Sequence, residues 1–124
     1  MNKAIISLVI VMSIWASCQQ EKYSQGKRIY TAYCANCHME NGEGLGEIYP
    51  SITKSSYLYG NITELPCLIL NGRQSSQLST VQMPGFSHLR EAELSNLINY
   101  MSHTWGDKSI LPIDEIQNKI INCQ

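Results

Sequence analysis

Three features that mark large classes of protein are missing from this sequence. Its 9 Lys and Arg residues are matched by 10 Asp and Glu and form no basic patch, which argues against a nucleic-acid partner. The longest apolar run, residues 4–16, is too short to cross about 30 Å of hydrocarbon as a helix. No internal repeat, low-complexity tract or interdomain linker occurs, so we expect one small domain.

A convincing strand hairpin is also missing, and the periodic segments are helical. Apolar or small residues recur at helical spacing from Tyr23, at Gly26, Ile29, Tyr30 and Tyr33. Three further helices are predicted over residues 64–70, 91–105 and 113–121.

Glycines mark the ends of two of these helices and the main loop that precedes both of them. Gly72 and Gly106 stand where the second and third predicted helices stop, and four glycines and Pro50 fall within residues 41–60. The fold class is therefore predicted to be all-α, with about four or five helices and long loops. Such loops suit a chain wrapped round a prosthetic group.

Cys34, Cys37 and His38 carry the strongest chemical signal, because they form the order C-x-x-C-H. This order is typical of covalent attachment of a c-type haem, with the two thiols bonded to the porphyrin and the imidazole beneath the iron. A C-x-x-C pair also occurs in thioredoxin-like motifs and in zinc sites. Neither fits well here, since no βαβ pattern surrounds Cys34 and no second ligand pair is present.

The N-terminus indicates export. Lys3 precedes a 13-residue apolar run that ends in Ala16-Ser17-Cys18, which resembles the processing site of a bacterial lipoprotein. We expect residues 1–17 to be a signal peptide, Cys18 to carry lipid, and residues 18–22 to be a tether at the periplasmic side of a membrane. Ordinary cleavage near Ala16 and an uncleaved anchor are the alternatives, since Trp15 stands where a leucine is usual.

From Tyr23 to Trp105 the chain resembles a small monohaem cytochrome c of the class I fold. The helix before Cys34, the loop at residues 41–52 and the Met83-Pro84-Gly85-Phe86 sequence each match a segment of that family. The domain is placed at residues 23–106, with residues 107–124 as an extension packed on it. Arg90 departs from the family pattern, which has a capping Ser or Asp before the last helix.

The resemblance implies the ligands of one covalently bound haem c. Cys34 and Cys37 would hold the porphyrin, His38 and Met83 would be the axial ligands, and the Pro50 carbonyl would orient His38. Gly26 would let an aromatic residue of the last helix, Tyr100, pass close by.

The other candidate ligands are less favoured. Met101 falls on the buried stripe of the last helix, and Met39 follows the proximal ligand too closely to reach round. His88 and His103 are more simply surface residues. Four aromatic residues are interpreted as lining the haem pocket or the core: Tyr49, Tyr57, Tyr59 and Trp105.

Two filled axial positions imply an electron carrier in a respiratory chain rather than an enzyme. The alternatives are a haem subunit of a membrane-associated oxidase, reductase or dehydrogenase, and a peroxidase or ligand sensor with an open distal site. Expected partners are membrane-bound redox proteins. Glu40, Glu43 and Glu47 form either a solvated loop or a surface that attracts a basic partner.

Cys67 and Cys123 remain once the other three cysteines are assigned. In an oxidising compartment we expect one disulfide between them rather than two free thiols. Two unpaired cysteines are the alternative. A bridge closes a loop of roughly 57 residues and stabilises by about 4 kcal/mol in the chain-entropy model.

Overall fold

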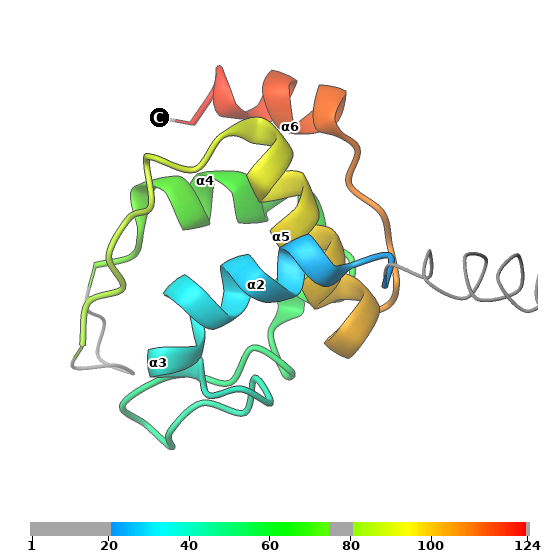
Figure 1. Cartoon of the computed structure of the whole chain (residues 1–124). Helices are drawn as coiled ribbons and strands as arrows, with labels where there is room; N and C mark the ends of the chain where they lie inside the picture. Colours follow the sequence, from blue (N-terminus) through cyan, green and yellow to red (C-terminus); the bar gives the residue numbers. More distant parts are fainter. Residues whose placement is uncertain (1–20, 75–80, 124) are drawn as a thin grey trace, which may run out of the picture.

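The computed structural model describes residues 21–74 and 81–123 (Figure 1). The predicted signal peptide at residues 1–17, Cys18 and most of the tether lie outside the described residues, as does Gln124. In the part that is described, no helix is long and apolar enough to cross a membrane.

Helices and loops make up the described chain, which confirms the all-α prediction. The α-helices are α2 (Ser24–Tyr33), α3 (Ala35–His38), α4 (Leu65–Asn71), α5 (Glu91–Trp105) and α6 (Ile113–Ile120), with short 3₁₀ helices η1 (Ser56–Leu58) and η2 (Ile62–Glu64). Extended pairing within the described ranges is limited to two isolated bridges, Leu45 with Tyr49 and Arg73 with Met83.

The crossing of α2 over α5 organises the domain (Figure 1). At the crossing point Gly26 lies against the backbone of Asn96 and the Cβ of Tyr100, so closely that a Cβ on residue 26 would overlap both. The sequence-based pairing of Gly26 with Tyr100 is therefore confirmed, and the Asn96 carbonyl is an equally close neighbour.

Helix α5 supplies the centre of the core. Leu94, Leu97 and Ile98 are fully buried and Met101 is 4% exposed, as their helical spacing predicts. Arg90 does not leave the helix uncapped, because the Glu93 carboxylate accepts hydrogen bonds from the Arg90 backbone N–H at 2.9 Å and from its Nε at 3.4 Å. These bonds lower the pKa of the Glu93 carboxyl.

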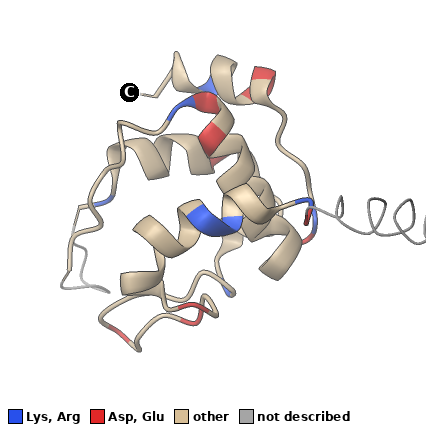
Figure 2. Cartoon of the chain, viewed as in Figure 1, with Lys and Arg blue, Asp and Glu red and all other residues tan. Residues whose placement is uncertain are grey.

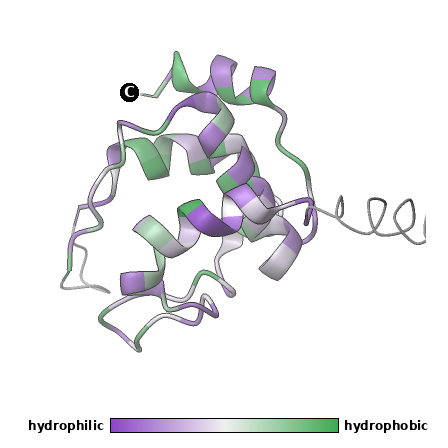
Figure 3. Ribbon diagram, in the orientation of Figure 1, coloured by the Kyte–Doolittle hydropathy of each residue, from purple (hydrophilic) through white to green (hydrophobic). Residues whose placement is uncertain are grey.

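The extension folds back over the domain (Figure 1). Helix α6 packs on α5, α4 and η2, and its Ile116 is fully buried together with Leu111 in the segment before it. Figure 3 shows the resulting mixture of apolar and polar positions along each helix, which is typical of amphipathic helices around a shared interior.

The α2–α5 crossing yields a stability prediction. Gly26→Ala should lower the free energy of unfolding by about 3 kcal/mol, because the added methyl group forces the two helices apart. Gly46→Ala is the matched control: Gly46 has φ +53°, but a methyl group added there would meet nothing within 4 Å, so we expect a loss of about 1 kcal/mol. Urea unfolding followed by circular dichroism measures both. Equal losses in the two variants would contradict the close crossing.

Candidate functional site: a cavity between α3, α4 and the Met83 segment

One cavity of about 400 Å³ lies in the middle of the fold. Its walls come from five parts of the chain: the end of α2 with α3, the loop at residues 48–58, helix α4 and the residues just after it, the segment around Met83, and the buried side of α5. Most of the lining side chains are apolar, including Ile52, Leu65, Leu68, Ile69, Phe86 and Leu97. Its volume is within the range of pockets that hold cofactors.

Cys34, Cys37 and His38 line the cavity together because of the local backbone. Cys34 joins α2 to α3, and its carbonyl accepts hydrogen bonds from the N–H groups of Cys37 at 3.2 Å and His38 at 2.9 Å. Residues at i, i+3 and i+4 share a helix face, so this single turn points both sulfurs and the imidazole the same way.

The two thiols are free in the structure. Burial, and then the neighbouring Cys37, raise the pKa of Cys34 to about 11. The Cys34 sulfur is therefore protonated at neutral pH in the unmodified chain.

His38 is held by Pro50. The His38 Nδ1 lies 2.9 Å from the Pro50 carbonyl oxygen, which can only accept a hydrogen bond, so Nδ1 carries the proton. In the neutral ring Nε2 then has the free lone pair, which is the form that binds a metal ion.

Backbone contacts of the proximal loop fix the position of Pro50. Gly44 (φ +70°) packs against the Tyr49 and Pro50 carbonyls, where a Cβ would overlap them, and the Ile52 N–H donates to the Gly42 carbonyl at 2.8 Å. On the other side the Tyr30 hydroxyl donates to the Met39 carbonyl at 2.7 Å, and burial raises the pKa of Tyr30.

Met83 lines the cavity from another segment. Its backbone exchanges two hydrogen bonds with Arg73, each 2.9 Å long, and its side chain is half-buried. Met101 also reaches the cavity wall, but from the core of α5, where it is 4% exposed.

The two other histidines lie outside the cavity lining. His88 is exposed and packs edge-on against Tyr33, with ring centroids 5.1 Å apart. His103 is exposed and stacks on Tyr23 at 4.5 Å. The interpretation of both as surface residues agrees with these positions.

Three of the four aromatic residues lie where the prediction places them, in the cavity lining or against the core. Tyr49 and Tyr57 line the cavity, whereas Trp105 packs edge-on against Tyr30 at 4.9 Å. Tyr59 is 51% exposed and donates a hydrogen bond to the Trp105 carbonyl, so its assignment to the pocket or core was wrong. Tyr33, at the end of the α2 stripe, lines the cavity and is 42% exposed.

The apolar wall supplied by α4 has only a weak signal in the sequence. Leu65, Leu68 and Ile69 sit at helical spacing in a seven-residue helix, too short to indicate which face meets a ligand.

The donor set suits a haem. Two free thiols, an imidazole with an available Nε2 and a thioether lie on the walls of one apolar cavity. A flat apolar macrocycle that carries an iron ion matches such walls, and soft sulfur and imidazole ligands suit iron.

The fold and the cavity define the class of protein: a small all-α domain that encloses one haem. A family model for cytochrome c matches residues 23–105, and the chain belongs to the cytochrome c family. Membership of this family implies covalently bound haem c, as the sequence predicted.

Two kinds of relative are found. The cytochrome c subunit of a quinone alcohol dehydrogenase from Gluconobacter oxydans is 30% identical over 93 residues, which cover 68% of this chain and 19% of the relative. Cytochrome c-552 from Thermus thermophilus is 26% identical over 99 residues, which cover 68% of this chain and 70% of the relative. The chain thus spans only about a fifth of the dehydrogenase subunit.

Proposed function

We propose that this protein is a single-haem electron carrier, with the haem bonded to Cys34 and Cys37 and ligated by His38 and Met83. The observation that carries the proposal is that one cavity has all four side chains on its walls. The free thiols of Cys34 and Cys37 would hold the haem by adding across its vinyl groups, with each sulfur bonding to one carbon and its hydrogen to the other, so the addition would need no oxidant.

The haem, when bound, supplies an iron ion that accepts and releases one electron. The chain's own residues decide how that happens. Pro50 fixes the tautomer and direction of His38, and the apolar side chains of α4 exclude water from the cavity. If His38 and Met83 both bind the iron, no position would be left for a substrate, which favours a carrier over a peroxidase or a sensor.

The relatives support two settings for this carrier. Cytochrome c-552 is similar over most of its own length, which favours a separate carrier in a respiratory chain. The alcohol dehydrogenase relative favours the alternative of a subunit that takes electrons from a membrane-associated dehydrogenase.

The surface beside the cavity fits a basic partner. Ile48 lines the cavity mouth and is 46% exposed, and the exposed Glu43 and Glu47 lie on the same loop. Figure 2 shows acidic positions on this loop below α3. Such a charge pattern attracts Lys and Arg of a redox partner and weakens as salt is added.

Export with a lipid at Cys18 is the second part of the proposal. A domain that binds haem does not need a membrane anchor, so the haem site gives no support for lipidation. The support comes from the apolar run and the Ala16-Ser17-Cys18 sequence alone. A lipid and a short tether would keep the domain beside membrane-bound respiratory enzymes on the periplasmic side.

Haem attachment is tested with the two cysteines. Replacing Cys34 and Cys37 together by Ala should abolish covalent haem, because no thioether can then form. Haem staining after reducing, denaturing gel electrophoresis measures this. Cys67→Ala with Cys123→Ala is the control and should keep the stain. A stained band in the Cys34 and Cys37 double variant would refute the attachment site.

Axial ligation is tested with Met83→Ala. The haem should stay attached, carbon monoxide should bind the reduced protein, and the reduction potential should fall by a sizeable part of the roughly 0.8 V over which axial ligands set haem potentials. Spectroscopic titration with carbon monoxide and redox titration measure these changes. Met39→Ala is the control and should leave both unaltered. An unchanged potential in Met83→Ala would assign the sixth position to another residue.

The lipid anchor is tested with Cys18→Ala. Wild-type protein should sediment with membranes and carry a diacylglycerol at Cys18, whereas the variant should lose the modification. Cell fractionation measures the membrane association, and intact-mass measurement shows whether Cys18 carries the lipid. An unmodified wild-type N-terminus after Ala16 would rule out the lipoprotein assignment.

A further inference from the structure

Helix α4 forms a single layer between the cavity and the C-terminal extension (residues 107–123). Leu65, Leu68 and Ile69 line the cavity. Cys67 lies about 200° round the helix from Leu65, on the opposite side, because each residue turns the helix by about 100°. In Figure 1 α6 lies along that side, and α4 and α6 are in contact.

The extension is fastened to α5 first. The Leu111 N–H donates to Asn99 Oδ1 at 2.7 Å, and the Leu111 carbonyl accepts from Asn99 Nδ2 and Ser95 Oγ, both at 3.1 Å. Leu111 and Ile116 are almost wholly buried. These contacts place α6 on the core helix independently of α4.

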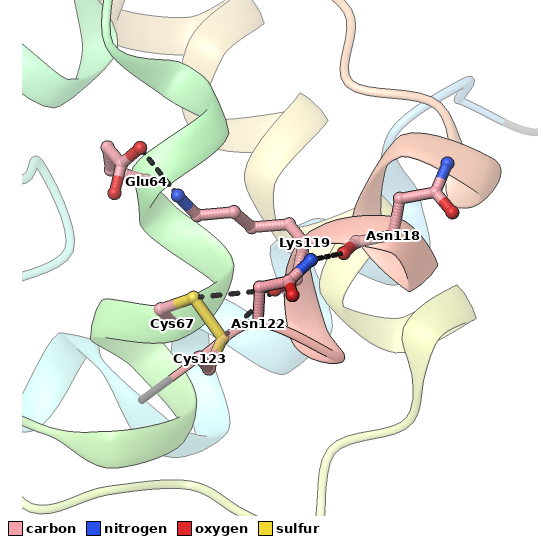
Figure 4. Close-up of a disulfide and its surroundings, with 6 residues drawn as sticks. All are labelled: Glu64, Cys67, Asn118, Lys119, Asn122 and Cys123. Carbon is pink, nitrogen blue, oxygen red and sulfur yellow. Dashed lines mark hydrogen bonds and ion pairs between the residues drawn. A yellow bond between two sulfur atoms is a disulfide. The ribbon is translucent and has the colours of Figure 1, made fainter.

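The extension is then fastened to α4 (Figure 4). A disulfide joins Cys67 to Cys123, with Cα atoms 5.2 Å apart, and Lys119 Nζ lies 2.6 Å from Glu64 Oε1. Both ionic side chains are partly exposed, so the ion pair contributes less than about 1 kcal/mol. The disulfide is therefore the stronger of these two side-chain links between α6 and α4, and it adds to their packing contact.

Helix α4 in turn holds the Met83 segment. The Phe86 N–H donates to the Ile69 carbonyl at 2.9 Å, and Arg73, just after the helix, makes the paired hydrogen bonds with Met83. Gly72 packs against the Met83 carbonyl, and Gly85 packs against the Leu70 carbonyl, too closely for a Cβ at either position.

Helix α4 needs outside support to do this. It has only seven residues, and its N-cap residue Glu64 makes no side-chain hydrogen bond to its first turn. Helices this short are unstable alone, because the free energy lost in forming the first turn exceeds the free energy gained from the hydrogen bonds of one or two turns. Its stability must come from packing on its two sides, the cavity side and the α6 side.

We propose that the Cys67–Cys123 disulfide is a positioning device: it ties α4 to the extension, and so keeps Met83 at the cavity. Opening the disulfide releases the α4–Met83 segment before the α2–α5 core unfolds. This inference rests on the proposed function for the role of Met83, but the link from the disulfide to α4 and the Met83 backbone stands on the contacts alone.

The test compares the holoprotein with the Cys67→Ala, Cys123→Ala double variant. Amide hydrogen exchange is followed at Arg73, Met83 and Phe86, and in α5. We expect exchange at the three amides to speed up at least tenfold more than in α5. The absorption band of methionine-bound ferric haem should also disappear at lower urea than the helical circular dichroism.

Two controls separate positioning from general stability. Wild-type protein in enough urea to match the variant's global stability should keep the three amides protected. Lys119→Gln removes the ion pair and leaves the disulfide, and its exchange rates should stay within about twofold of wild type. The proposal would be overturned if Lys119→Gln lost as much protection at the three amides as the double cysteine variant. It would also be overturned if exchange at these amides rose only as much as exchange in α5.

If the double variant does not fold, the disulfide can instead be opened chemically in the folded wild-type protein. The folded wild-type holoprotein is reduced with a phosphine, its thiols are alkylated, and the same amides are measured, with the same expected and contrary results. Wild-type protein that lacks the methionine band would contradict Met83 as the ligand. The exchange rates would still decide whether the disulfide holds the segment.

Discussion

The contact of Gly26 with α5 is the constraint on which the rest of the structure depends. Because residue 26 has no side chain, α2 lies directly on the Asn96 carbonyl and the Tyr100 Cβ. Helix α2 runs straight into α3, so this contact also fixes where Cys34, Cys37 and His38 face. This wall of the cavity is thus positioned by a helix crossing that is remote from Cys34, Cys37 and His38 themselves.

The sequence predicts this half of the site well, because its geometry is local. A C-x-x-C-H order on one helical turn fixes three side chains relative to one another. The nearby glycines and Pro50 predict a loop, and the family resemblance implies the contact of Pro50 with His38 that the structure shows. The helices were equally predictable: the Leu94, Leu97, Ile98 and Met101 stripe matches the buried face of α5.

The other half depends on contacts that no local pattern specifies. The paired hydrogen bonds of Arg73 with Met83, and the close approach of Gly72 to the Met83 backbone, join two segments on either side of a long polar stretch. The exposure of Tyr59 was missed for the same reason, since its hydroxyl bonds to the carbonyl of Trp105 far along the chain. A single sequence carries no record of such pairings.

The two walls therefore differ in how they are supported. His38 sits on a turn continuous with α2 and is hydrogen-bonded to a loop only 12 residues away, so its position follows from the α2–α5 crossing and from local contacts. Met83 is attached to a short helix whose outer side is tied to a cysteine 56 residues further along. Segments held by fewer and more distant contacts open at lower free energy than the core. The Met83 wall is consequently the side of the cavity on which changes outside the cavity can act, through the extension that the disulfide ties to α4.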